Sequence, residues 1–387
     1  MLPIAAPDGS VQETDSITVR GARPCADVPL RAGPVLYGSM NPRTAPTGHG
    51  HGPHPRARRP LAALARALAP VLLLAGSLAA SAQPAEKFVF MTNWFAEAEH
   101  GGFYQALATG LYRKHGLDVD IRMGGAQVNI TQLMAAGQAD CIIGATDLQV
   151  VVARENGVPL VTVAAMFQKD PDALIAHTDV TSLAGLKDRS ILIAASSYQN
   201  FWPWLKARYG FTDAQARPYT FNVQPFVADA RLAQQGYITS EPYALEKAGV
   251  KFNAFLLSDF GYPPYSTTIV CMESTVRKRH AALAAFVRGS VEGWKSYLAD
   301  PAPGNALIKK DNPSMTDDQL DFSVRKIRET GLVTSGDAAR LGIGIMTDAR
   351  LKASFDFLVA SHLVDPAKVD LAKTYTTEFV KDLKILP

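Results

Sequence analysis

The sequence predicts an α/β protein of two doubly wound lobes that are joined by a hinge of two chain segments. From Lys87 onward, short apolar runs of strand length alternate with stretches whose apolar residues recur at helical spacing. This alternation ends near 181–186 and then starts again. Strand–helix–strand repetition with short turns is typical of mostly parallel sheets with helices on both faces. Two such runs therefore predict two sheets, one in each lobe.

The first lobe begins with alternating strands and helices. The strands are expected at 87–92, 117–123, 140–144 and 160–166. The helices are expected at 102–115, 128–136 and 147–156. Gly116, Gly137 and Gly157 each fall just past one of these helices, where glycine commonly ends a helix in a left-handed conformation.

The second lobe repeats the alternation, and the chain then returns to the first lobe. Strands are expected at 190–195, 217–222, 236–239 and 252–257, and helices at 199–209, 225–234 and from Glu241. After these come a strand at 267–272 and helices at 274–298, 316–329 and 348–361. We predict a first lobe of 86–176 plus 267–387 and a second lobe of 180–263, with crossings near 177–180 and 261–265. Because ligands of open α/β sheets lie beyond the carboxyl ends of strands, we expect a binding cleft between the lobes.

The N-terminal region is expected to be absent from the processed protein. Residues 1–55 are rich in Pro, Gly, Ala and His without apolar periodicity, which indicates a disordered segment or a mis-annotated extension. Residues 56–82 carry four arginines, then a short apolar run, then Ala80-Ser81-Ala82, which is the order of a signal peptide. We therefore predict cleavage near Ala82–Gln83 and a periplasmic location.

Charge and cysteine content argue against nucleic-acid binding and against a metal centre. Removing residues 1–82 takes away eight Lys and Arg but only four Asp and Glu, which leaves 31 positive and 32 negative groups. The pI of 8.6 therefore belongs largely to the leader, and no basic nucleic-acid surface is predicted. Cys141 and Cys271 fit either buried thiols or one disulfide. The histidines after residue 82 are too scattered for a zinc motif, so no metal is predicted.

Four segments carry a resemblance to a known family. They are 93–104 (NWFAEAEHGGFY), 108–119 (ATGLYRKHGLDV), 136–140 (AGQAD) and 235–242 (QGYITSEP). Their combination resembles the substrate-binding proteins of importers for taurine, alkanesulfonates, nitrate and thiamine pyrimidine precursors, over essentially all of 86–380. The resemblance implies a type II periplasmic binding protein fold and a monomer that captures a small solute. It also implies the membrane permease of an ABC-type importer as partner.

The Asn-Trp strand end and the histidine that follows it are most similar to the binders of pyrimidine precursors. That branch includes a synthase that makes the thiamine pyrimidine from its own histidine and pyridoxal phosphate. Ala145 falls where the synthase has its cofactor lysine, and Gln149 falls where it has the consumed histidine. A Schiff base needs an amine and this chemistry needs the imidazole. We therefore predict a receptor that is not an enzyme and holds no cofactor. The synthase, a nitrate or sulfonate receptor and a ligand sensor for a signalling partner are the alternatives.

Three residues of the first lobe are predicted to contact the ligand. Asn93 and Trp94 follow the first strand, where an indole face can stack on a flat ring and an amide can both donate and accept. The alternative for Trp94 is packing under the first helix. His100 can donate to a carbonyl or acidic group, or it can be a satisfied capping histidine. Glu97 and Glu99 are expected mainly to complement a helix dipole.

In the second lobe, Ser196, Ser197 and Tyr198 follow a strand and open a helix. Their hydroxyls and free backbone N–H groups suit an anionic or carbonyl group, and plain helix capping is the alternative. Trp202 is predicted to supply a second aromatic face, with an ordinary core position as the alternative.

Glu241 is the most informative predicted contact. It lies in a Ser-Glu-Pro turn after a short strand, where its carboxylate can accept hydrogen bonds from an amino-substituted heterocycle. The same carboxylate would repel nitrate or a sulfonate. The alternative is an acidic first turn before Pro242. Tyr265, at the second crossing, is a further candidate. Together these residues favour a flat, amino-bearing heterocycle such as a thiamine pyrimidine precursor.

Overall fold

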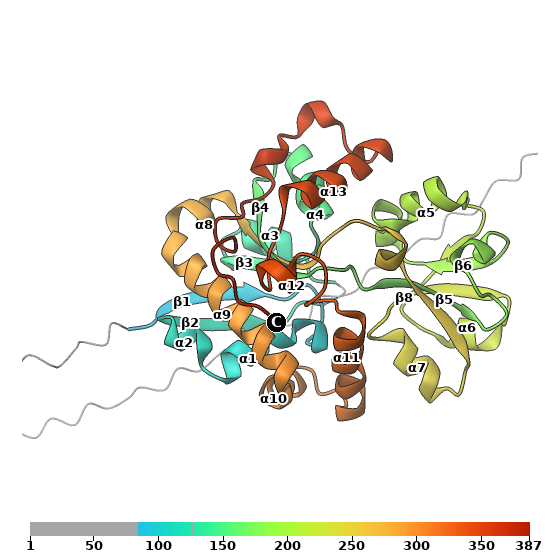
Figure 1. Ribbon diagram of the computed structural model, residues 1–387, viewed down its shortest axis with the longest axis horizontal. Helices are drawn as coiled ribbons and strands as arrows, with labels where there is room; N and C mark the ends of the chain where they lie inside the picture. The colour runs from blue at the N-terminus through green and yellow to red at the C-terminus, as the bar shows by residue number, and fades with distance from the viewer. Residues whose placement is uncertain (1–83, 126) are drawn as a thin grey trace, which may run out of the picture. The chain divides into compact units, whose positions relative to one another are not determined.

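The structure of the protein is a computed structural model that describes residues 84–387 with the exception of residue 126 (Figure 1). The predicted extension at 1–55 and the predicted signal peptide at 56–82 lie outside these residues. The described residues belong to one of the two units into which the chain divides, Ala80–Pro387. Among them, no helix is both long enough and apolar enough to cross a membrane.

The first sheet has five strands in the order β2-β1-β3-β10-β4. Their bounds are β1 Glu86–Met91, β2 Leu117–Arg122, β3 Cys141–Thr146, β4 Leu160–Phe167 and β10 Ser266–Met272. β1 runs parallel to β2 and β3, whereas β10 runs antiparallel to β3 and β4. Every residue of β4 is buried, as expected for a strand covered on both faces.

The second sheet also has five strands, in the order β7-β6-β8-β5-β9. Their bounds are β5 Asp172–His177, β6 Ser190–Ile193, β7 Ala216–Pro218, β8 Leu232–Tyr237 and β9 Phe252–Leu256. β6 runs parallel to β7 and β8, and β5 runs antiparallel to β8 and β9.

Both sheets are therefore mixed, whereas the sequence predicts mostly parallel ones. In each sheet the antiparallel strand is the one that follows a crossing from the other sheet, β5 or β10. A chain that crosses between the sheets enters at the carboxyl edge of the neighbouring strands, so it runs against them. Asp172, the first residue of β5, accordingly pairs with Tyr237, the last residue of β8.

Thirteen α-helices surround the two sheets in the described residues (Figure 1). Their bounds are α1 Gly101–Ala108, α2 Leu111–Lys114, α3 Ile130–Ala135, α4 Leu148–Glu155, α5 Phe201–Tyr209, α6 Gln224–Ala228, α7 Glu241–Lys247, α8 Glu273–Lys278, α9 His280–Ala299, α10 Ala302–Asp311, α11 Asp317–Thr330, α12 Ala338–Leu341 and α13 Asp348–Ala360. Short 3-10 turns precede α1 (η1, Ala98–His100) and α5 (η3, Ala195–Gln199) and follow β9 (η4, Leu257–Phe260).

The predicted helix at 225–234 is wrong in its second half. The helix, α6, ends at Ala228, and the strand β8 begins at Leu232. Two buried glutamines, Gln234 and Gln235, interrupt the apolar pattern of this strand. The side-chain oxygen of Gln235 accepts a hydrogen bond from the Ala194 amide at 2.6 Å, so a polar residue is held inside the sheet.

The predicted first lobe extends to residue 176, but β5 hydrogen-bonds only with strands of the second sheet. The crossing from β4 to β5 is short, at 168–171, and lies between two buried strands. It carries no Gly-rich linker that would reveal it in the sequence. We propose that the second lobe begins near Pro171 and ends near Gly261.

One arginine holds both crossings between the sheets. Arg350 Nη2 of α13 donates hydrogen bonds to the carbonyl oxygens of Gln168, at 2.7 Å, and Pro263, at 3.1 Å. These two residues lie in the first and second crossing, respectively. The guanidinium also lies 3.9 Å from the centre of the Tyr265 ring. The two segments that join the sheets are thus tied to one side chain.

α1 and α9 approach each other at a contact that glycine makes possible. Cβ atoms added at Gly101 and Gly102 would lie 2.1 Å and 2.2 Å from the rings of Tyr297 and Trp294, respectively. A Cβ added at Gly293 of α9 would lie 2.2 Å from the carbonyl oxygen of Gly102. Glycine therefore allows the start of α1 to lie directly on α9. This contact fixes the segment that precedes α1.

Cys141 and Cys271 form a disulfide bond between β3 and β10. The two residues are register partners on neighbouring strands, and both are fully buried. Of the two possibilities that the sequence left open, the structure contains the disulfide.

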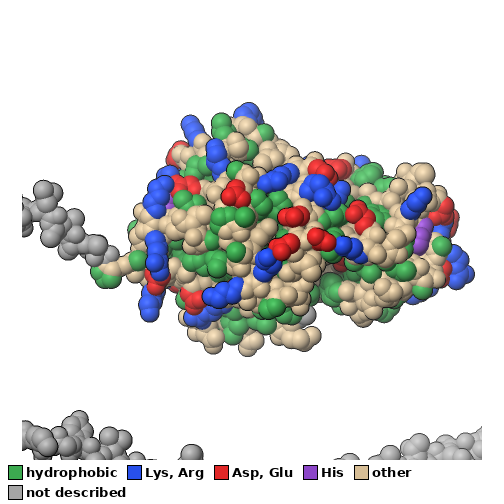
Figure 2. Space-filling model, turned by 90° about the horizontal axis from the view of Figure 1, so that it is seen from below, with side chains coloured by type: hydrophobic (Ala, Val, Ile, Leu, Met, Phe, Trp, Pro, Cys, Tyr) green, Lys and Arg blue, Asp and Glu red, His purple; other side chains and the backbone are tan. Residues whose placement is uncertain are grey.

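Figure 2 shows Lys and Arg side chains interspersed with Asp and Glu over one face of the protein. This mixture fits the nearly balanced charge of the chain after residue 82.

Candidate functional site

The carboxyl ends of strands from both sheets meet at one place, which we call the junction. The segment after β1 leads into η1, and the segment after β8 leads into α7. Thr239 Oγ1 donates a hydrogen bond to Glu99 Oε1 across the junction. Ser323 Oγ of α11 donates to the Thr239 carbonyl oxygen at 2.8 Å. The location agrees with the rule that ligands of open α/β sheets bind beyond the carboxyl ends of strands.

Four aromatic rings form a cluster at the junction. Trp94 and Phe95 follow β1, and Tyr219 and Phe221 follow β7. The Trp94 ring centre lies 5.3 Å from that of Phe221 and 5.6 Å from that of Phe95. Tyr219 and Phe221 are 5.4 Å apart. Phe95 is 43% exposed and Phe221 57% exposed, so the cluster reaches the surface. It offers flat apolar faces contributed by both sheets.

Glu241 is held by two hydrogen bonds at the first residue of α7. Its Oε1 accepts from the Tyr219 hydroxyl at 3.0 Å, and its Oε2 accepts from the Tyr237 amide at 2.8 Å. A Cβ added at Gly236 would lie 2.9 Å from Glu241 Oε2, which explains a glycine in β8 at this point. Burial raises the pKa of the Glu241 carboxyl, although both hydrogen bonds oppose the rise.

His100 is buried and neutral at physiological pH. Its Nε2 lies 3.1 Å from Asn93 Oδ1 and 3.8 Å from Glu97 Oε1, while its Nδ1 is buried with no hydrogen-bond partner. Burial lowers the pKa of the His100 imidazole to about 3. The histidine therefore offers a neutral ring rather than a counter-ion to the carboxyl groups around it.

Five carboxyl groups converge on the junction: those of Glu97, Glu99, Asp170, Asp172 and Glu241. Burial raises the pKa of each of them. Their mutual repulsion also contributes, because Glu99 and Glu241 raise the pKa of Glu97 and Asp170 raises that of Asp172. Within residues 84–387 apart from 126, none of the five forms an ion pair with Lys or Arg. We call this group the acidic cluster.

The role predicted for Glu99 as a helix-dipole residue does not describe its contacts. Glu99 is buried, 4% exposed, and lies in the 3-10 turn η1, where it accepts the hydrogen bond from Thr239 of the second sheet. The phenol of Tyr237 also lies among the carboxyl groups. Burial raises its pKa well above the ordinary value, and Asp172, Asp170, Glu97 and Glu99 raise it further.

The structure places Ser196, Ser197 and Tyr198 in η3, at the carboxyl end of β6. Ser197 is buried, and its Oγ donates to the side-chain oxygen of Gln235 at 2.9 Å. Ser196 and Tyr198 are exposed. The capping alternative is not what the structure contains, since the residue before η3 is Ala194, which has no side-chain cap. A role in ligand binding stays a prediction for these three residues.

Trp202 does not lie at the junction surface. It is fully buried in the core beside the second sheet, and its Nε1 donates to Asp213 Oδ1 at 2.8 Å. The helical spacing of Phe201, Trp202 and Leu205 buries these side chains together, which is the core alternative. We therefore leave Trp202 out of the proposed site.

Tyr265 is also fully buried, in the second crossing. Its ring lies under Arg350, and its amide donates to Asp147 Oδ1 at 2.9 Å. We leave Tyr265 out of the proposed site as well, because these contacts hold the crossing. Ala145 lies near the end of β3 and Gln149 in the first turn of α4, where Gln149 Oε1 accepts a hydrogen bond from the Ala145 amide at 3.1 Å.

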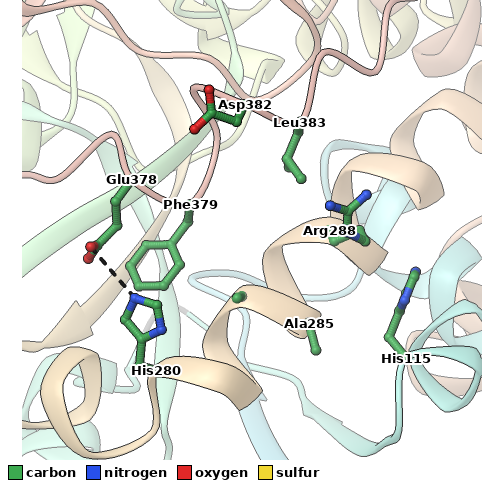
Figure 3. Close-up of a pocket in the computed structure, with 9 residues that line it drawn as sticks. His115, His280, Ala285, Arg288, Glu378, Phe379, Asp382 and Leu383 are labelled. Carbon is green, nitrogen blue, oxygen red and sulfur yellow. Dashed lines mark ion pairs between the residues drawn. The ribbon is translucent and has the colours of Figure 1, made fainter.

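Two surface hollows lie away from these residues. The first, of about 360 Å³, is lined by side chains of α9 and the C-terminal segment together with His115 (Figure 3). In it, His280 Nε2 lies 3.6 Å from a carboxylate oxygen of Glu378. The second, of about 570 Å³, is lined by residues between 340 and 348 and between 377 and 386. Neither hollow contains a residue that the sequence predicted for the site.

Several junction residues were not predicted from the sequence. Tyr219 and Phe221 were predicted to lie in a strand at 217–222, but β7 ends at Pro218 and both residues lie in the loop after it. Thr239 was predicted as the last residue of a strand at 236–239, whereas β8 ends at Tyr237. Asp170 and Asp172 flank a proline at the first crossing, and this Asp-Pro-Asp pattern was the one available signal of buried acids.

Comparison with known proteins identifies relatives that are named as binding proteins. The riboflavin-binding protein RibY of Chloroflexus aurantiacus is 25% identical over 317 residues, which cover 78% of this chain and 88% of that protein. A formylaminopyrimidine-binding protein of Halalkalibacterium halodurans is 25% identical over 221 residues, which cover 54% of this chain and 66% of that protein.

Solved structures show the same fold. The periplasmic aliphatic sulphonate-binding protein SsuA of Escherichia coli aligns with a TM-score of 0.57 at 13% identity, over 74% of this chain and 91% of that chain. At this identity the likeness concerns the fold alone. The predicted fold class, a periplasmic binding protein fold with two α/β sheets, is confirmed.

The predicted family is confirmed as well. The family described as NMT1/THI5 like matches residues 97–303, which is more than half of the chain. The matched range includes η1, most of both sheets and Glu241. This chain belongs to the NMT1/THI5-like family.

Proposed function

We propose that this protein is the solute-binding receptor of an ABC-type importer and that it captures a flat, amino-bearing heteroaromatic molecule at the junction. One observation carries the proposal. The rings of Trp94 and Phe221 and the carboxyl groups of Glu99 and Glu241 meet there. In each pair, one residue follows a strand of the first sheet and the other follows a strand of the second. An aromatic face stacks on a flat ring, and a carboxylate accepts hydrogen bonds from amino groups.

The relatives support a heteroaromatic ligand. Two proteins that are 25% identical to this chain are named for riboflavin and for formylaminopyrimidine. Both molecules contain a planar nitrogen heterocycle. A ligand of this type would use both the aromatic faces and the carboxyl acceptors of the junction.

The acidic cluster disfavours nitrate or a sulfonate as ligand. An anion needs a cation or a set of N–H donors, whereas the junction presents five carboxyl groups and a neutral histidine. Any carboxyl group that ionises would repel the ligand. A cationic or amino-bearing ligand would instead relieve the repulsion among the carboxyl groups.

The residues at the two positions where the synthase has its cofactor lysine and its consumed histidine also fit a receptor rather than a synthase. Ala145 has no amine to form a Schiff base with pyridoxal phosphate, and Gln149 has no imidazole to donate. The amide of Ala145 and the side chain of Gln149 bond to each other. We propose that the protein makes and breaks no covalent bond in its ligand.

We further propose that the processed chain acts as a periplasmic monomer that delivers its ligand to a membrane permease. In such a receptor the ligand binds the closed arrangement of the two lobes more tightly than the open one, and this difference shifts the population toward the closed state. The permease would then recognise that state.

Thermal-shift measurements on the chain without residues 1–82 test the proposal. We expect stabilisation by riboflavin or by an aminopyrimidine, and none by nitrate or taurine. A ligand at 100 times its Kd stabilises a protein by about 2.7 kcal/mol. Trp94→Ala should weaken binding about 5- to 150-fold, the range for losing one stacked ring. Glu241→Gln should weaken it about 10- to 150-fold, through a lost charged acceptor.

Glu378→Gln, in the hollow of Figure 3, is the matched carboxylate control and should leave binding unchanged. Stabilisation by nitrate or taurine alone would refute the proposed ligand class. Turnover of pyridoxal phosphate would refute the receptor role and favour the synthase.

A further inference from the structure

Phe221 has a backbone conformation that is unusual for its residue type. Its φ of +59° lies in the left-handed region, which bulky side chains rarely adopt. Such a conformation persists only where the surrounding contacts hold it in place. Burial is a weak reason here, because 57% of the Phe221 surface remains exposed. The contacts of the Phe221 ring therefore have to stabilise this backbone conformation.

The Phe221 ring contacts Trp94, which follows β1 of the first sheet. Their ring centres are 5.3 Å apart, and the ring planes are inclined by 46°. Phe95 also meets Trp94, in an edge arrangement at 5.6 Å and 74°. A flat ligand that stacks on the side of Trp94 where Phe221 lies must displace the Phe221 ring. Phe95 directly follows Trp94 in the chain, whereas Phe221 lies on a loop of the opposite sheet.

Phe221 lies between two held neighbours: Tyr219 before it, and Val223 after it, which packs against the core cluster that contains Tyr219. Tyr219 is buried, 6% exposed, and its hydroxyl donates to Glu241 at 3.0 Å. Two residues later, Phe221 is the most exposed of the large apolar side chains in the described part of the chain. Because the Phe221 side chain is exposed, it can turn away from Trp94 while the hydrogen bond from Tyr219 to Glu241 is kept.

We propose that Phe221 is a displaceable cover for the face of Trp94 at which the ligand stacks. This inference rests on the proposed function. The cover sets a requirement for the ligand, which must offer Trp94 a better contact than a phenyl ring does. A planar heterocycle meets that requirement, and a small ion without a ring does not. Phe221 is thus a specificity-determining residue that acts through Trp94.

Quenching of tryptophan fluorescence by acrylamide tests the cover without any ligand. The other three tryptophans are buried, at 0% for Trp202, 8% for Trp204 and 0% for Trp294, so Trp94 dominates the quenchable signal. In the full-length chain, Phe221→Ala should increase the quenching constant, and Phe221→Leu should increase it less. Trp94→Phe should remove the quenchable component. Leu386→Ala changes a similarly exposed apolar residue, 47% exposed, and should leave the constant unchanged.

Titration with riboflavin and with an aminopyrimidine tests the displacement. If the ligand must displace Phe221, Phe221→Ala should tighten binding by roughly 2- to 12-fold, the range expected when one competing aromatic pair is removed. Weaker binding in Phe221→Ala would overturn the proposal, since it would make Phe221 the second wall of the site. Unchanged affinity would overturn it too.

The experiments distinguish a wrong role for Phe221 from a wrong proposed function. If neither probe binds any variant, the proposed ligand class is wrong, and quenching alone decides whether Phe221 covers Trp94. An unchanged quenching constant in Phe221→Ala, with the far-UV circular dichroism spectrum retained, overturns the cover whatever the ligand is. The variant Phe221→Gly, which tolerates the left-handed backbone, provides a second chain without the ring.

Discussion

Asp147, which contacts the second crossing, makes the stability of the protein depend on pH. It is 3% exposed, and its Oδ1 accepts a hydrogen bond from the Tyr265 amide at 2.9 Å. Burial raises its pKa to about 7, although Arg350 and its hydrogen bonds oppose the rise. Between its ordinary value of 3.8 and about 7, the folded chain holds a proton that the unfolded chain has released. The free energy of unfolding must therefore fall as pH rises through this window.

Asp147→Asn should remove this contribution. The shift corresponds to on the order of 4 kcal/mol between the two protonation states, and asparagine retains an oxygen for the Tyr265 amide. We expect the variant to lose less stability than the parent between pH 4 and pH 8. Urea unfolding at several pH values measures the difference. Asp188→Asn, an exposed carboxylate, should keep the slope of the parent. A slope in Asp147→Asn equal to that of the parent would contradict the assignment.

At the residue scale, the sequence identified side chains that carry chemistry at strand ends. Asn93, Trp94 and Glu241 lie just after predicted strands, and His100 lies just before a predicted helix. The structure brings all four to the junction. Trp202 could not be separated from a core residue, because core and site tryptophans share the same spacing. Phe221 was missed because the sequence predicted a strand through 217–222, whereas β7 ends at Pro218 and Phe221 adopts a left-handed loop conformation.

At the scale of elements, the alternation of strands and helices was predictable because each element has a buried and an exposed face. The two ends of β8 could not be predicted, because Gln234 and Gln235 are buried polar residues that interrupt the apolar pattern of the strand. The predicted helix at 274–298 is two helices, α8 and α9, with a break at Arg279. α10 was missed, because its moderate polarity hides its buried face.

The contact between α1 and α9 yields a prediction about packing. Gly293→Ala would place a methyl group 2.2 Å from the Gly102 carbonyl oxygen and 2.7 Å from Ala106 Cβ. Both neighbours are held in α1, so the two helices must separate. We expect a loss of about 1 to 3 kcal/mol in the free energy of unfolding. Thermal or urea unfolding measures it.

Arg288→Ala is the matched control on α9, because Arg288 is exposed on the same helix. It should change stability by less than about 0.5 kcal/mol. Equal stability of Gly293→Ala and the parent would show that the helices can move apart at little cost, and the close contact would then not be needed.

At the scale of the whole molecule, the disulfide between Cys141 and Cys271 closes a loop that contains the entire second sheet. The two residues are 130 positions apart. Closing a loop of that size in the unfolded chain stabilises the fold by roughly 5 kcal/mol in the chain-entropy model. The double variant Cys141→Ala/Cys271→Ala should lose stability of that order, as measured by urea unfolding.

Reduction offers a second measurement on the parent chain. Both cysteines are fully buried, so dithiothreitol should leave the bond intact under native conditions and cleave it only in denaturant. Mass spectrometry after alkylation of free thiols reads the outcome. Rapid alkylation of both cysteines in the native, dithiothreitol-treated protein would contradict the buried bond.

The single guanidinium of Arg350 that fastens both crossings has a mechanical consequence. If the sheets turn relative to each other, we expect the axis of that rotation to pass close to the Arg350 side chain, which ties the two connecting segments together. A point near the axis moves little, and a point far from it sweeps a wide arc. Small changes in backbone angle near Arg350 would then separate the aromatic rings of Trp94 and Phe221 by a much larger distance.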